Sequence, residues 1–167
     1  MSKFMDTLSL KALSNIPEIN PGMDISELII QNIYKEGLKL KSGDIIVIAQ
    51  KIISKTEDRY VKLSNIEPSA EALALAQKVD KTPEFIQLVI NESNKILSSD
   101  NNILITEHKL GFVNINAGID MSNIIDNKEQ VLLLPEDPNK TALGLSKIIS
   151  NELNLNIDII ISDSMTR

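Results

Sequence analysis

The segment Ile157-Asp158-Ile159-Ile160-Ile161 constrains the fold more than any other part of the chain. It is short, rich in branched side chains and almost wholly apolar, which is typical of a central strand in a sheet covered on both faces. Residues 45–49, Ile-Ile-Val-Ile-Ala, have the same character. We therefore expect two such strands, and the polar residues that follow them should reach a sheet edge where ligands commonly bind.

Predicted helices alternate with these strands and with others, which indicates an α/β fold of mixed sheets with packed helices. Each helix is expected to begin at a residue that favours helix starts. The predicted starts are Asp24, Ser69, Thr82 with Pro83, and Asp137 with Pro138. The helix that begins at Thr82 is expected to extend its apolar face to Ile96. Further strands are predicted at 59–63 and 131–134, and a hairpin at 103–106 and 112–116, with no linker between any of these elements.

Composition and charge exclude several functional classes. The chain has 167 residues and a formal net charge of −6, which argues against a surface for duplex nucleic acid. It contains no Cys, so disulfides, thiolate nucleophiles and Cys-bound metals are excluded. No apolar run approaches the roughly 20 residues of a membrane span, and the first residues do not form a secretory signal. We therefore expect a cytoplasmic protein without nucleic-acid or membrane partners.

Two lysines follow the predicted strand 45–49 directly. Lys51 and Lys55 are four positions apart, so one helical turn would bring them to the same side. Together with the neighbouring Ser54, two ammonium groups at a strand end could bind phosphates. The alternative is a solvated Lys-rich loop, because charged runs often only face water.

Carboxylates and other hard oxygen donors follow two further strands. Asp120 and Asn123 come after the small pair Ala117-Gly118, which allows close backbone approach or positive φ. Asp163 and the hydroxyl of Ser164 follow the terminal strand. Such oxygens suit Mg²⁺. On spacing alone, however, an ordinary glycine turn with an Asp/Asn cap is the better explanation of the first segment, and a surface turn explains the second equally well.

Two other polar features are better explained by structure than by chemistry. Residues 134–138, Leu-Pro-Glu-Asp-Pro, have the pattern of a helix entry. His108 is the only histidine and lies in the predicted hairpin loop, without a triad partner or metal cluster in the sequence around it. We expect it to be exposed.

Taken together, these segments resemble the family of coenzyme F420-0:L-glutamate ligases, the gamma-glutamyl ligases of deazaflavin coenzyme biosynthesis. The resemblance rests on eight short segments in the family's order, which span most of the chain. They are residues 42–47 (SGDIIV), 51–55 (KIISK), 67–69 (EPS), 105–107 (ITE), 111–113 (GFV), 116–123 (NAGIDMSN), 132–138 (LLLPEDP) and 162–164 (SDS).

The resemblance implies the family's gamma-glutamyl ligase fold, a homodimer, and a ligase that joins L-glutamate to coenzyme F420-0. GTP would phosphorylate a carboxylate of the coenzyme, and the amine of glutamate would attack the acyl phosphate, with Mg²⁺ or Mn²⁺ screening the phosphate charge. Asp120 and Asp163 would bind one metal ion and Ser164 a second. Lys51 and Lys55 would meet the GTP phosphates. The residues implied to line the rest of the nucleotide site are Ile16, Pro17, Glu18, Ile19, Gln50 and Asn123.

The chain also departs from the family's pattern. Gln50 stands where the family usually has a small hydroxyl residue, and residues 163–167 replace an Asp-Thr-Phe-Gly-Arg-Pro-like segment. The family continues past this point, so residues 1–167 are predicted to be the N-terminal portion of its domain. Two alternatives to the ligase follow: a catalytically incomplete homologue that binds nucleotide or metal, and a subunit completed by a separate C-terminal chain.

Overall fold

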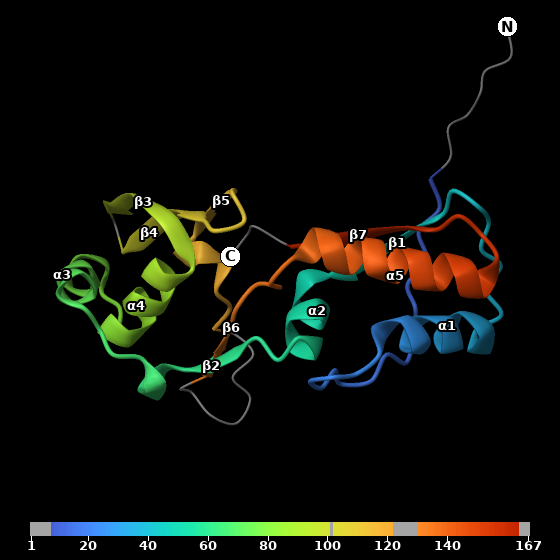
Figure 1. The fold of residues 1–167 in the computed structure, drawn as a ribbon, viewed down its shortest axis with the longest axis horizontal. Coiled ribbons are helices and arrows are strands. Elements are labelled where there is room, and N and C mark those ends of the chain that lie inside the picture. Colours follow the sequence, from blue (N-terminus) through green and yellow to red (C-terminus); the bar gives the residue numbers. More distant parts are fainter. Residues whose placement is uncertain (1–7, 101, 122–129, 164–167) are drawn as a thin grey trace, which may run out of the picture.

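Two groups of helices and strands, each with its own apolar cluster, make up the protein. The structure is a computed structural model that describes residues 8–100, 102–121 and 130–163. Figure 1 shows one group around α1, α2, α5, β1 and β7, and the other around α3, α4 and β3–β5, with β2 and β6 between them. We call these groups the β1–β7 lobe and the β3–β5 lobe. The predicted α/β class with mixed sheets and packed helices is confirmed.

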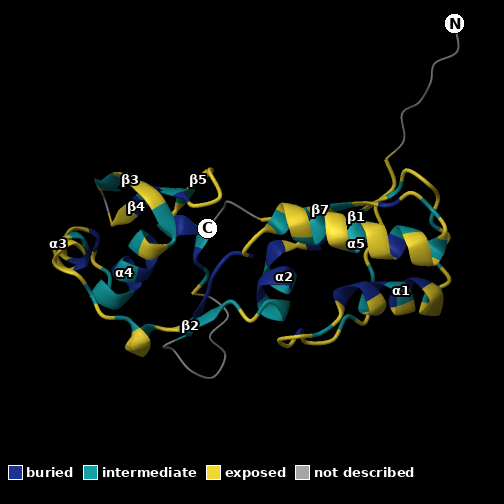
Figure 2. Ribbon diagram, viewed as in Figure 1, coloured by how far each residue is buried: buried dark blue, intermediate teal, exposed yellow. Residues whose placement is uncertain are grey.

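The β1–β7 lobe is built on a parallel pair of strands. Its elements are α1 (Ile25–Lys35), β1 (Ile45–Ala49), α2 (Gln50–Thr56), α5 (Pro138–Leu153) and β7 (Asp158–Ser162). The register runs from Ile45 beside Asp158 to Ala49 beside Ser162. Ile48 joins the apolar cluster that α1 and α5 also supply, while Figure 2 shows α5 with exposed residues spaced along its length.

Only one face of this sheet is covered by described residues. Burial alternates along both strands, and Ile45, Val47 and Ile160 are exposed on the opposite face, Val47 by 60%. The prediction of two strands covered on both faces is therefore wrong for this part of the chain. The reason is that the described helices of this lobe pack against a single face of a two-stranded sheet.

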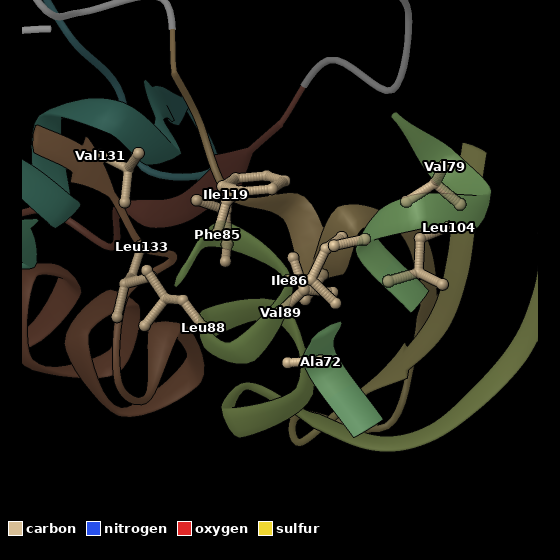
Figure 3. Packing of buried hydrophobic residues seen from close by; sticks show 12 residues of the cluster. Ala72, Val79, Phe85, Ile86, Leu88, Val89, Leu104, Ile119, Val131 and Leu133 are labelled. Carbon is tan, nitrogen blue, oxygen red and sulfur yellow. The ribbon is translucent and has the colours of Figure 1, made fainter. Parts of the chain in front are cut away.

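The β3–β5 lobe combines two helices with an antiparallel sheet. It contains α3 (Ala70–Val79), α4 (Pro83–Asn91), β3 (Ser93–Asp100), β4 (Ile103–His108) and β5 (Val113–Ile115). The strand order is β3-β4-β5. In Figure 3 the α4 side chains Phe85, Ile86 and Val89 lie between Val131 on one side and Leu104 on the other. The amphipathic face of α4 thus fills the centre of this lobe.

The predicted extension of this second helix to Ile96 is wrong. The helix α4 ends at Asn91, and β3 begins at Ser93 and pairs with β4. Two register shifts interrupt that pairing, between Ser93 and Lys95 and between Ile96 and Ser98. Such irregular strands lack the strict alternation by which a sequence reveals them.

Short strands and one arginine connect the two lobes. β2 (Tyr60–Lys62) pairs antiparallel with β6 (Gln130–Leu132), as Figure 1 shows. Beside them the Arg59 guanidinium donates from Nε to the Leu134 carbonyl oxygen at 2.9 Å. Its terminal nitrogens meet the carboxylates of Glu92 at 3.2 Å and Glu136 at 3.3 Å. Arg59 therefore ties α4 of one lobe to the segment that leads into α5 of the other.

His108 is buried, which corrects the expectation that it is exposed. It is the last residue of β4, lies on the buried face of that strand, and is 3% exposed. Its ring stacks on that of Phe112, with the ring centroids 5.1 Å apart. Its Nδ1 accepts a hydrogen bond from the backbone N–H of Leu110 at 3.0 Å. Burial lowers the pKa of His108, while the neighbouring Glu92 carboxylate acts in the opposite direction. His108 thus stabilises the turn between β4 and β5 in its neutral form.

No helix among the described residues is long and apolar enough to cross a membrane.

Candidate functional site

A cleft of about 670 Å³ opens at the carboxyl ends of β1 and β7. Because these strands are parallel, the residues that follow them meet at one sheet edge. A second wall comes from β5 and the 3-10 turn η2 (Asn116–Gly118) of the other lobe. The lining residues are Val47, Ala49, Gln50, Lys51, Asn114, Ile115, Asn116, Gly118, Ile119, Asp120, Ser162 and Asp163.

Four residues predicted for nucleotide and metal binding lie in this cleft: Gln50, Lys51, Asp120 and Asp163. Lys51 and Asp120 form an ion pair, with Lys51 Nζ 2.6 Å from Asp120 Oδ2. Their side chains are 31% and 18% exposed, so the pair is partly shielded from water and open to the cleft. Gln50 is 8% exposed, and its Oε1 accepts a hydrogen bond from the Ser54 hydroxyl at 2.9 Å.

Backbone contacts fix the position of Asp120. Its N–H donates to the Leu132 carbonyl and its own carbonyl accepts from the Leu132 N–H, both at 2.9 Å. The preceding residues Asn116, Ala117 and Gly118 have φ values of 50°, 53° and 68°. The positive φ suggested by the Ala117-Gly118 pair is therefore confirmed. Consecutive left-handed residues are uncommon and persist only where packing holds them, as it does for Ala117 at 1% exposure.

The structure places a second group of predicted residues beside the cleft and not in its lining. Lys55 lies one turn after Lys51 in α2, and its Nζ forms an ion pair with Glu18. This pair brings the predicted segment 16–19 next to α2. Ile19 of that segment is 6% exposed and belongs to the apolar cluster of the β1–β7 lobe, so its side chain serves packing.

Two predicted residues fall outside the part of the chain that the structure describes. They are Asn123, predicted for the nucleotide site, and Ser164, predicted for a second metal ion. Their roles stay predictions.

Two asparagines in the wall of the cleft, which lie in a candidate segment of the sequence, had no predicted role. Asn114 and Asn116 both line it, and the Oδ1 atom of Asn116 is enclosed without a hydrogen-bond partner. Their spacing of two along a predicted strand was the signal that could have found them, because alternate strand residues share a face.

The donors in the cleft suit a hard divalent cation. Asp120 and Asp163 offer carboxylate oxygens, and the Asn116 carboxamide adds an oxygen that lacks a partner. Within residues 8–100, 102–121 and 130–163, no three His, Cys, Asp or Glu residues gather into a metal-binding group. Mg²⁺ and Mn²⁺ tolerate such a sparse protein shell, since Mg²⁺ commonly takes one or two carboxylates together with water and phosphate oxygens.

The chain is similar in sequence to a known protein family. The sequence model of the family described as F420-0:gamma-glutamyl ligase matches residues 14–167. The chain is 36% identical over 160 residues to the coenzyme F420:L-glutamate ligase of Methanothermobacter thermautotrophicus, covering 96% of this chain and 63% of the relative. Identity to the ligase of the same name from Methanocaldococcus jannaschii is 38% over 145 residues, 87% of this chain and 55% of the relative. For Methanopyrus kandleri the values are 32% over 163 residues, 98% and 62%. The chain thus spans less than two thirds of the length of these relatives.

Proposed function

The chain belongs to the F420-0:gamma-glutamyl ligase family, and on that premise we propose that it acts as a GTP-dependent ligase that joins L-glutamate to coenzyme F420-0. The observation that carries the proposal is the cleft in which Lys51, Asp120 and Asp163 come together at the ends of two parallel strands. An ammonium group and two carboxylates at such an edge suit a phosphate-transfer site, because they can hold an anionic nucleotide and a divalent cation side by side.

The proposed reaction has two steps. A carboxylate oxygen of coenzyme F420-0 attacks the γ-phosphorus of GTP, the bond to the β-γ bridging oxygen breaks, and GDP leaves. The amine nitrogen of glutamate then attacks the acyl carbon, phosphate leaves, and the amine gives up a proton as the amide forms. Lys51 would hold a phosphate oxygen and offset its negative charge.

The other predicted site residues have proposed roles in binding metal ions and the nucleotide. Asp120 and Asp163 would hold Mg²⁺ or Mn²⁺, with Ser164 at a second ion; a bound divalent ion would supply charge neutralisation for the transferred phosphate. Lys55, Gln50, Asn123 and the segment 16–19 would complete the nucleotide site. The ion pair between Lys55 and Glu18 supports this, because it brings that segment to the helix that carries Lys51.

We also propose that the protein is a homodimer and works in the cytoplasm, where GTP is made. The exposed apolar face of the β1–β7 sheet, with Ile45, Val47 and Ile160, supports an association with a second copy. Apolar side chains grouped on a surface often mark an interface. The proposed partners are otherwise small molecules: coenzyme F420-0, L-glutamate and GTP.

A ligation assay with the purified protein tests the function. The protein is mixed with coenzyme F420-0, L-glutamate, GTP and Mn²⁺, and the glutamylated coenzyme is measured by mass spectrometry alongside release of GDP. We expect product only when GTP and glutamate are both present. Asp120→Asn should lower the rate by a factor on the order of 100 or more, as expected when transition-state charge loses its support.

The matched control for this assay is Asp158→Asn. Asp158 is an exposed carboxylate at the opposite end of β7 from the cleft, so its loss should leave the rate near that of the unmodified protein. GTP-independent product, or no product with any combination of these substrates, would refute the proposed function.

A further inference from the structure

The ion pair between Lys51 and Asp120 joins two residues that the proposed function assigns to different ligands. In the proposed function Lys51 binds a phosphate of GTP, and Asp120 binds a divalent cation. Yet Lys51 Nζ lies 2.6 Å from Asp120 Oδ2. The ammonium therefore occupies a carboxylate oxygen that a metal ion would need, and the carboxylate holds an ammonium that a phosphate would need.

The two partners differ in freedom to move. Asp120 is fixed through its backbone by the paired hydrogen bonds to Leu132 and by the left-handed turn that precedes it. Lys51 reaches it from the first turn of α2 on a flexible four-carbon chain with three rotatable N–H donors. An exchange of partners therefore requires a swing of the lysine side chain, while Asp120 stays in place.

The neighbouring lysine provides an internal contrast. Lys55 lies one helical turn further along α2 and forms an ion pair with Glu18, whose side chain is 68% exposed. Its ammonium contributes positive charge near the cleft without contacting a predicted metal ligand. A comparison of the two lysines thus separates direct competition for Asp120 from the general effect of a nearby positive charge.

We propose that Lys51 is the resident cation of the Asp120 site and exchanges partners on ligand binding, so that metal and nucleotide bind cooperatively. The exchange rests on the proposed function. Without nucleotide, Lys51 competes with the metal ion for Asp120. A triphosphate draws Lys51 away from the Asp120 carboxylate, and a metal ion at Asp120 in turn weakens the attraction of that carboxylate for Lys51. Because coupling between two binding equilibria is reciprocal, each ligand must raise the affinity for the other by the same factor.

The first test measures Mn²⁺ binding to the chain without nucleotide, by the electron paramagnetic resonance signal of free Mn²⁺. Lys51→Met removes the competing ammonium and should tighten Mn²⁺ binding about tenfold, within the usual range of coupling between sites. Lys55→Met removes the same charge and should tighten it by a much smaller factor. Lys51→Arg restores a cation and should return the affinity toward that of the unmodified chain.

The second test measures a non-hydrolysable GTP analogue by calorimetry without metal. Asp120→Asn removes the carboxylate charge from the ion pair with Lys51 and should tighten binding of the analogue. Asp163→Asn removes an equal charge from the same cleft. The ion pair of Lys51 is with Asp120, so the effect of this second substitution should be clearly smaller. In the unmodified chain the analogue should also raise the Mn²⁺ affinity, and by a larger factor than in Lys51→Met.

Defined outcomes overturn the exchange. The proposed exchange is wrong if Lys51→Met leaves the Mn²⁺ affinity unchanged or weakens it. It is also wrong if Lys55→Met raises the Mn²⁺ affinity as much as Lys51→Met does. Failure of both the unmodified chain and Lys51→Met to bind Mn²⁺ would refute it as well. Circular dichroism of each variant checks that it is folded. The binding measurements require no turnover, so a protein that fails the ligation assay can still show the exchange. If the protein is an active ligase but Lys51→Met does not change its Mn²⁺ affinity, the proposed function stands and the proposed exchange is refuted.

Discussion

At the scale of single residues, the wall of the cleft depends on a backbone conformation that few side chains allow. Gly118 has a φ of 68° and is the last of three left-handed residues. A Cβ atom at this position would lie 2.7 Å from Leu134 Cδ1. Gly118 thus permits both the turn and the close approach of Leu134, and through the turn it sets the position of Asp120.

Gly118→Ala should lower the free energy of unfolding by about 1–3 kcal/mol, because Ala is strained at positive φ and must displace the Leu134 side chain. Chemical denaturation measures the change. The control is the same substitution at Gly144, which lies inside α5 with open space around it. There alanine should raise stability by about 0.5–1 kcal/mol, since it favours the helix. Equal effects at the two glycines would contradict this account.

At the scale of helices and strands, the caps show what local sequence can predict. Asp24, Ser69 and Asp137 were predicted to begin helices, and each accepts a hydrogen bond from a backbone N–H in the first turn. Thr82 is also at the predicted helix start, but its side chain makes no capping bond. Position in the sequence therefore identified the start, whereas the capping bond depends on a side-chain rotamer that the sequence does not specify.

Ser69→Ala should destabilise the protein by about 1 kcal/mol, because the Ala72 N–H loses its acceptor, which lies at 3.2 Å. Thr82→Ala removes no capping bond and should change stability by less than about 0.5 kcal/mol. Thermal and urea denaturation of both variants provide the comparison. A larger loss for Thr82→Ala than for Ser69→Ala would show that the geometry of these two caps has been misassigned.

The part of the candidate site that lies at the ends of β1 and β7 could be predicted from the sequence. Lys51 and Asp163 each come directly after an apolar strand, and the parallel pairing of those strands brings them to one edge. The role of Asn116 could not be predicted in this way, because its place in the wall depends on the left-handed turn. The exposed face of the β1–β7 sheet was also missed, since an apolar run does not reveal how many faces of a sheet are covered.

At the scale of the whole molecule, Arg59 is a polar tie between the lobes. Its guanidinium reaches a backbone carbonyl and two carboxylates in separate parts of the chain, and its side chain is 20% exposed. The side chain of Glu92, which directly follows α4, is 14% exposed, and one of its carboxylate oxygens lies 3.6 Å from Lys109 Nζ. A planar guanidinium can satisfy these acceptors together, whereas an ammonium cannot match their geometry.

Arg59→Lys keeps the charge and should nevertheless lower the free energy of unfolding by about 1–3 kcal/mol, as expected for the loss of charged hydrogen bonds. The control is Lys109→Met, which removes a second ion pair of Glu92, from a side chain that is 56% exposed. Its effect should stay within about 1 kcal/mol, the usual size for an exposed pair. Urea titration followed by circular dichroism measures both. An Arg59→Lys variant as stable as the unmodified protein would show that the tie contributes little.

The pairing of β1 with β7 also determines when the cleft can exist during synthesis. Near this sheet Ser42 and Asn156, 114 positions apart, are joined by a hydrogen bond from the Asn156 N–H to the Ser42 hydroxyl. The α3, α4 and β3–β5 segments lie between them in the chain. β1 must wait for a partner that is translated much later, with its apolar residues and open edge exposed. The cleft can therefore form only after β7 has been translated, because both strands supply residues that line it.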